Sequence, residues 1–142
     1  MLTTLAFTTP PNPDPDPNFG VHPDLIVRAI QFPQGFKVGT CTDVKVAIAN
    51  LNNAEVTGKI QVELYVSPNG APAYTLNKVM LGIGPKKTKF ITFKDIKVPN
   101  KKQLKLRVRV NPKKWIQESN HYNNKKLIYP KPTDLCSSEL LF

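Results

Sequence analysis

The stretch that decides the fold lies between residues 104 and 129 and reads Leu104-Lys-Leu-Arg-Val-Arg-Val110, then Trp115-Ile-Gln-Glu-Ser-Asn-His-Tyr-Asn-Asn124, then Lys126-Leu-Ile-Tyr129. The first segment alternates apolar and basic residues, as a strand with one buried face does. The middle segment is rich in Asn and Ser, whose side chains bond back to the local backbone and favour turns. The stretch predicts two strands joined by a structured hairpin connection, in which Glu118, Asn120, Asn123 and Asn124 bond backbone groups of the last hairpin.

The same period of two continues through most of the chain. Strands are expected near residues 24–31, 42–51, 58–66, 74–82, 87–97, 103–110 and 125–129. Seven short strands at this spacing predict an all-β, seven-stranded antiparallel immunoglobulin-like β-sandwich. The predicted core comprises Leu25, Val27, Ile30, Val44, Val46, Ile48, Ile60, Val62, Leu64, Phe90, Leu104, Leu106, Val108 and Val110.

Extended arms are expected at both ends of this sandwich. Residues 10–18 hold five prolines in nine positions, so they can form neither a helix nor a central strand. We divide the chain into an N-terminal Pro-rich arm at 1–22, a sandwich at 23–132 and a C-terminal tail at 133–142. Both tips are apolar, and we expect them to bind other protein subunits through Leu2, Leu5, Phe7, Leu140, Leu141 and Phe142.

Charge and composition narrow the class of protein. The 142 residues are 40% hydrophobic and 21% charged, which is typical of a soluble globular domain. No apolar run approaches the ~20 residues of a membrane span. The first residues lack the basic start and long apolar centre of a signal peptide, so we expect synthesis in the cytoplasm.

The net charge of +10 is concentrated in the second half of the chain. Alternation places Lys105, Arg107 and Arg109 on one strand face. Two interpretations stay open: a solvated face that discourages aggregation, or a footprint for an acidic protein surface. Nucleic acid is the weaker alternative, because Arg is scarce and aromatic residues are not interleaved with the basic strand.

Candidate catalytic groups are few. His22 and His121 are the only histidines, and there is no phosphate loop, nucleophile elbow or paired carboxylate motif. We therefore expect a non-enzymatic protein without cofactor or metal. Cys41 and Cys136 are placed so that a disulfide is topologically allowed, with two free thiols as the alternative.

Several segments resemble a known family. Pro23-Asp-Leu-Ile-Val-Arg-Ala-Ile30, Val44-Lys-Val-Ala-Ile-Ala-Asn50, Leu81-Gly-Ile-Gly-Pro-Lys-Lys87 and the run Glu118-Ser-Asn-His-Tyr-Asn-Asn124 resemble the CARDB domain, the cell-adhesion-related domain found in bacteria. The resemblance implies a mostly non-catalytic binding or spacer module. Asn111 stands where the family usually has Asp and His121 where it usually has Glu, which removes two carboxylates that a metal could use.

The resemblance also suggests roles for two aromatic residues. It implies that Trp115 packs over the end of the sandwich. Trp115 and Tyr122 could instead form a carbohydrate-stacking platform, or Trp115 could anchor a protein interface.

Two functions follow from these expectations. The first is a structural subunit of a larger assembly, such as a decoration or accessory protein of a virus or phage particle, attached by its arms and basic face. The alternative is a secreted or cell-surface adhesion or carbohydrate-binding module. We expect protein partners in a homo- or hetero-oligomer, and a location in a virion, an extracellular assembly or at the cell surface.

Overall fold

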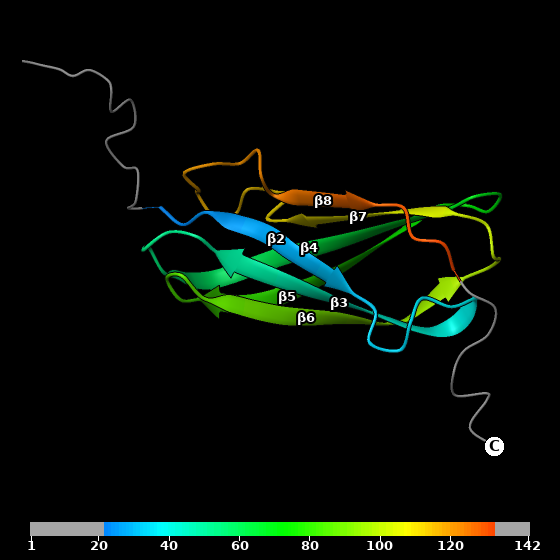
Figure 1. Ribbon diagram of the computed structural model, residues 1–142. Coiled ribbons are helices and arrows are strands. Elements are labelled where there is room, and N and C mark those ends of the chain that lie inside the picture. Colours follow the sequence, from blue (N-terminus) through cyan, green and yellow to red (C-terminus); the bar gives the residue numbers. More distant parts are fainter. Residues whose placement is uncertain (1–21, 133–142) are drawn as a thin grey trace, which may run out of the picture.

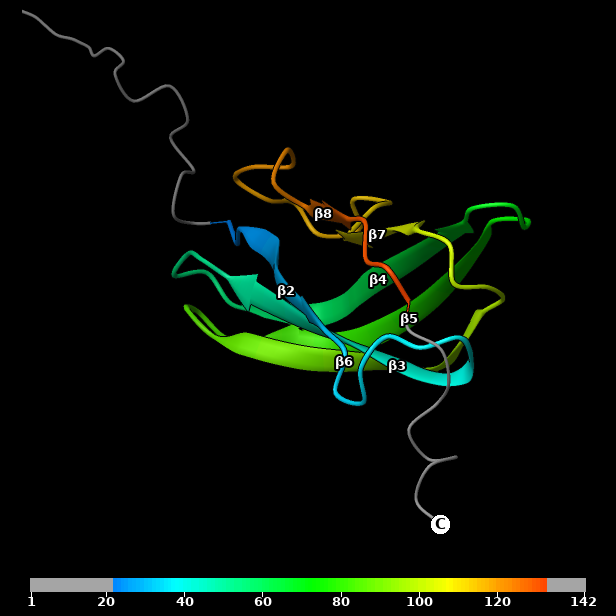
Figure 2. The same ribbon diagram turned by 45° about the vertical axis from the view of Figure 1, so that its right-hand side comes forward.

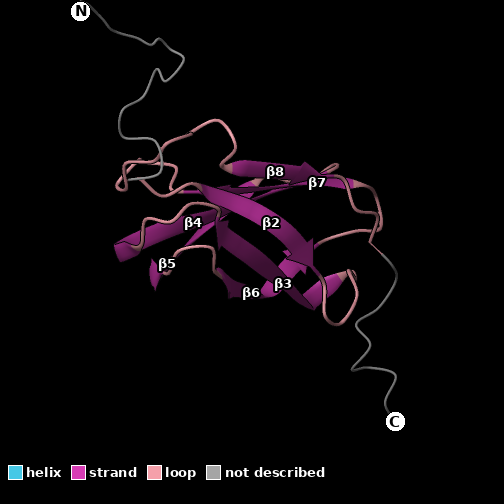
Figure 3. Cartoon of the chain, turned by 60° about the vertical axis from the view of Figure 1, so that its left-hand side comes forward, coloured by secondary structure: helices cyan, strands magenta, loops and turns pink. Residues whose placement is uncertain are grey.

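The computed structural model describes residues 22–132, which form strands and loops without a helix (Figure 3). No helix in this range could cross a membrane. The strands are β2 (Leu25–Gln31), β3 (Gly39–Asn50), β4 (Val56–Pro68), β5 (Tyr74–Ile83), β6 (Thr88–Val98), β7 (Leu104–Val110) and β8 (Lys125–Ile128). Each matches a strand expected from the sequence, with ends that differ by at most three residues.

The strands form two antiparallel sheets that face each other (Figures 1 and 2). One sheet has the order β2-β3-β6 and the other the order β5-β4-β7-β8. This is the immunoglobulin-like sandwich that the alternation predicts. The long connection between β7 and β8, the closing loop of residues 111–124, lies beside the start of β2 at one end of the sandwich (Figure 1).

Side chains from both sheets fill the space between them. The alternate positions of β7, Leu104, Leu106, Val108 and Val110, are all buried there, while the basic residues between them face outward. Each fully buried aliphatic side chain contributes roughly 1.5–3 kcal/mol. The two-residue period therefore accounts for most of the core.

One predicted core residue is wrong. Phe90 is 54% exposed and pairs with Ala47, which is not part of the core cluster between the sheets, whereas the neighbours of Ala47 in β3, Val46 and Ile48, are. Lys45 lies over the Phe90 ring, with Nζ 4.5 Å from its centroid. Phe93 is buried instead, and Ile96 joins it because Asp95, at a φ of 55°, interrupts the alternation of β6. Ile30 is only partly buried against the core.

Candidate functional site

A buried carboxylate organises the closing loop. Glu118 Oε1 accepts a hydrogen bond from the backbone N–H of Leu25 at 2.6 Å. Its Oε2 accepts hydrogen bonds from the side-chain amides of Asn111 and Asn124, each at 2.7 Å. A buried carboxylate is tolerated when several donors satisfy it, so Glu118 acts as a structural hub.

Burial raises the pKa of Glu118, and the three donated hydrogen bonds only partly oppose this effect. The carboxylate of nearby Asp24 raises it further. His121 Nδ1 lies 3.8 Å from Glu118 Oε2, which becomes an ion pair when the imidazole is protonated. The loop therefore has one buried acid facing one partly exposed histidine.

The amides of the closing loop bind the first strand rather than the last hairpin. Asn124 Nδ2 donates to the Leu25 carbonyl at 3.0 Å, and Asn123 Nδ2 donates to the Asp24 carboxylate at 2.9 Å. Asn120 bonds the loop backbone, where its Oδ1 accepts the N–H of Tyr122 at 2.8 Å. The expectation that these side chains bond the last hairpin was thus wrong for Glu118, Asn123 and Asn124.

The hydrogen bonds that Asn111 makes in the network around Glu118 were not predicted from the sequence. Its φ is 56°, a left-handed conformation that Asn tolerates better than most residues. Its Nδ2 donates to the Ile116 carbonyl at 2.8 Å, and its Oδ1 accepts the Ile116 N–H at 3.1 Å. An Asn-Pro pair directly after a strand was the available signal for a turn of this kind.

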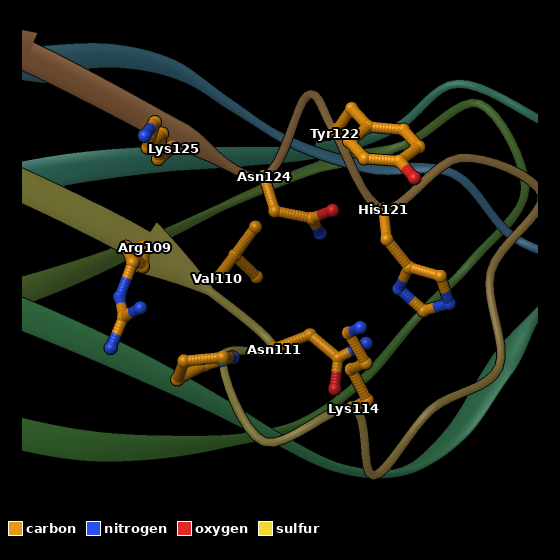
Figure 4. Close-up of a pocket in the computed structure, with 9 residues that line it drawn as sticks. Arg109, Val110, Asn111, Lys114, His121, Tyr122, Asn124 and Lys125 are labelled. Atoms are coloured by element: carbon orange, nitrogen blue, oxygen red, sulfur yellow. The ribbon is translucent and has the colours of Figure 1, made fainter.

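A pocket lies where β7 ends, β8 begins and the closing loop folds over them (Figure 4). Its cavity volume is about 240 Å³. Figure 4 shows His121 and Asn124 on opposite sides of the open space, with Lys114 below it and Tyr122 above. Its lining comprises Arg109, Val110, Asn111, Pro112, Lys114, His121, Tyr122, Asn124 and Lys125.

The basic strand carries its charges on the outer face of the four-stranded sheet. Arg109 forms two hydrogen bonds with Glu63 of β4, Nε to Oε1 at 2.8 Å and Nη2 to Oε2 at 3.1 Å. Arg107 Nη2 lies 3.7 Å from the same Oε1, and its guanidinium lies 4.7 Å from the centroid of the Tyr65 ring. Sequence reasoning missed Glu63, which partly neutralises this face.

The two proposed platform residues are exposed. Trp115 is 51% exposed and Tyr122 is 96% exposed. Ile116, not Trp115, packs against the core at this end of the sandwich. Only Tyr122 lines the pocket.

The remaining site residues expected from the sequence lie outside residues 22–132. Cys136, Leu140, Leu141 and Phe142 at the C-terminus, and Leu2, Leu5 and Phe7 at the N-terminus, lie outside the described residues. The Cys41–Cys136 disulfide and the docking of the arms therefore stay predictions.

Comparison with known proteins identifies the family. Residues 22–127 match the family model of the CARDB domain. The chain belongs to the CARDB family. This CARDB domain is similar in structure to a CARDB domain from Pyrococcus furiosus solved in complex with di-metal ions, with a TM-score of 0.65 and 23% identity over 81% of this chain and 96% of that one. A domain of a putative cell surface protein from Methanosarcina acetivorans has a TM-score of 0.64 and 19% identity over 79% and 93% of the two chains. No curated protein matches.

The closing loop of this CARDB domain does not fit a pair of metal ions. Among residues 22–132 no group of three or more His, Cys, Asp or Glu side chains could hold a metal ion. Asn111 has a neutral amide, and it donates its side-chain N–H to Glu118. Both Glu118 oxygens already accept hydrogen bonds. Calcium and magnesium sites need several free oxygen ligands, which this network does not offer.

Proposed function

We propose that this CARDB domain is a non-enzymatic interaction module that binds an acidic protein surface through the outer face of its four-stranded sheet. The observation that carries the proposal is the cluster in which one glutamate, Glu63, holds two arginines beside Tyr65. Family membership supports the class, because CARDB is a cell-adhesion-related family that is not known for enzymes.

The strand register supports a continuous binding face. Thr75, Tyr65, Arg107 and Leu127 form one cross-strand row, and Asn77, Glu63, Arg109 and Lys125 form the next. Tyrosine and arginine are enriched in protein interfaces. Leu127 is partly exposed beside Arg107 and supplies apolar contact area. The face therefore combines ring, aliphatic and cationic surface.

Electrostatics favours an acidic partner. One carboxylate, Glu63, faces two guanidinium groups, and Lys105 adds a further positive charge to the same strand face. Arg107 Nε is buried and has no hydrogen-bond partner within the described residues. Because Glu63 holds the arginines before binding, less side-chain entropy is lost when a carboxylate docks.

Two biological settings are considered for this interaction module. In the first, the domain is a secreted or cell-surface adhesion module, an inference supported by the family and by the similar domain of a putative cell surface protein. In the second, it is a subunit of a larger assembly, such as a virus or phage particle, bound through its terminal arms. The second rests on segments outside residues 22–132, and nothing in the fold favours a particle over another assembly. We therefore prefer the first.

The test uses the full chain and immobilised poly-L-glutamate as the acidic probe. The variant Lys105→Gln/Arg107→Gln should weaken binding at least about fivefold, whereas the control Lys87→Gln/Lys97→Gln, which removes two exposed charges elsewhere, should weaken it less than about twofold. Binding of the native chain should also fall as salt rises above about 0.15 M. Equal losses in both variants would show that net charge alone drives binding, and would refute the proposed face.

A further inference from the structure

The pocket at the end of β7 has an unbalanced charge. Four of its lining residues are basic, namely Arg109, Lys114, His121 and Lys125, and none is acidic. A concave site lined by one sign of charge concentrates ions of the opposite sign. The pocket therefore favours an anionic ligand.

The positively charged side chains of the pocket differ in whether they already pair with another side chain of the domain. Arg109 is held by Glu63 through two hydrogen bonds. Within residues 22–132, Lys114 and Lys125 have no ion pair or side-chain hydrogen bond. Both residues are exposed and line the pocket. These two ammonium groups are the available partners for a carboxylate.

The uncharged walls of the pocket limit the size and shape of the ligand. Pro112 is the one lining residue that offers an aliphatic side chain outside the core, and the exposed Tyr122 ring stands at the rim of the pocket (Figure 4). The volume of about 240 Å³ lies below the roughly 300–1,000 Å³ of sites that enclose drug-sized molecules. A single ring-sized unit fits these dimensions.

We infer that the pocket binds one carboxylated sugar, such as a uronic acid unit of an acidic polysaccharide. The carboxylate would pair with Lys114 and Lys125, and the C–H face of the sugar ring would lie on Tyr122. An Asp or Glu side chain of a peptide offers the carboxylate but no ring-sized apolar face for Tyr122. This inference goes beyond the proposed function. The pocket shares Arg109 and Lys125 with the sheet face but does not include Lys105 or Arg107.

The backbone around the pocket is held in place before any ligand binds. Lys114 has a φ of 57°, and its N–H donates to the Asn111 carbonyl at 3.0 Å. Asn111 is itself fixed by Glu118 and Ile116. Left-handed backbone at non-glycine residues is costly and persists where surrounding contacts enforce it. The turn therefore fixes the Lys114 backbone before a ligand binds, so only its side chain has to be ordered on binding.

The test is an NMR titration of the full, isotopically labelled chain with D-glucuronate. Saturable shift changes are expected at Lys114, His121, Tyr122 and Asn124, and none at equal concentrations of D-glucose. The variant Lys114→Gln/Lys125→Gln should weaken glucuronate binding at least about tenfold, because it removes both charge-assisted hydrogen bonds to the carboxylate. Tyr122→Ala should weaken it about threefold or more, and Lys87→Gln/Lys97→Gln should leave it unchanged.

Three results would overturn the inference. Equal binding of glucose would show that the lysines are not used. Equal binding of sulfate or N-acetylglutamate, with no effect of Tyr122→Ala, would show an unspecific anion site. Shift changes spread over both sheets would show binding by net charge. The sheet face is tested by Lys105→Gln/Arg107→Gln on poly-L-glutamate and the pocket by Tyr122→Ala on D-glucuronate, so failure of one proposal is distinguished from failure of the other although both surfaces include Arg109 and Lys125.

Discussion

Glu118 accepts a hydrogen bond from the Leu25 N–H at 2.6 Å, although 93 positions separate the two residues. The bond joins the closing loop to the first strand of the opposite sheet. Asn124 adds a second connection by donating to the Leu25 carbonyl. The edge strand β2 is thus held by the loop as well as by its antiparallel pairing with β3.

Replacing Glu118 should strongly destabilise the domain. In Glu118→Gln the side chain keeps its shape but has one acceptor oxygen for three donors, so buried N–H groups of Leu25, Asn111 or Asn124 lose their partner. We expect a loss of about 2–3 kcal/mol in the free energy of unfolding, measured by urea denaturation. The exposed Glu55→Gln is the control and should change it by less than about 0.5 kcal/mol. Similar values for both would show that Glu118 is not a hub.

The contribution of Glu118 should depend on pH. Burial raises its pKa, so the folded chain binds the proton more tightly than the unfolded chain does. Its contribution to stability is then fully present below the unfolded pKa of about 4.3 and is lost as pH rises through the folded value. The difference in unfolding free energy between the native chain and Glu118→Gln should shrink as pH rises from about 4. A difference that grows would mean that hydrogen bonds to the carboxylate outweigh its burial.

The two phenylalanines of β6 should differ in their effects on stability. Phe93 is buried in the core, so Phe93→Ala should cost about 3–5 kcal/mol. Phe90 is half exposed under Lys45, and Phe90→Ala should cost less than about 1 kcal/mol. Urea unfolding of both variants measures the two losses in the free energy of unfolding. Comparable losses would contradict the register between β3 and β6.

Gly82 should be intolerant of a side chain. Its φ is +68°, and a Cβ there would lie 2.9 Å from the Val56 carbonyl oxygen, which is backbone and cannot move aside cheaply. Gly82→Ala should therefore destabilise the domain by more than about 1 kcal/mol. Gly58→Ala is the matched control, since its Cβ would meet only the Ile116 side chain at 3.9 Å. A Gly82→Ala variant as stable as the control would contradict the backbone geometry at this position.

Removing residues 1–18 should leave the domain folded, because β2 begins at Leu25. We expect the same melting temperature within about 2 °C and, if the arm attaches the protein to an assembly, weaker self-association by analytical ultracentrifugation. A large drop in melting temperature would place the arm in the core. Unchanged association would remove the arm from attachment.

The sequence alone determined the strands, because alternation with a period of two is a local property of each segment. All seven strands and most core residues of β3, β4 and β7 follow from it. Resemblance in the motif Glu118-Ser-Asn-His-Tyr-Asn-Asn124 also indicated the family. The run Lys89-Phe-Ile-Thr-Phe93 marks the limit, because apolar residues occupy both parities and alternation cannot choose between Phe90 and Phe93.

Only the tertiary structure decided which distant residues meet. The Asn-rich closing loop could bond its own backbone or another strand, and the choice of Leu25 depends on how the two sheets stack. Glu63 meets Arg109 because β4 and β7 pair in one particular register. The pocket likewise forms from residues on β7, β8 and the closing loop. Such contacts depend on sheet pairing and packing over long separations, which no local pattern encodes.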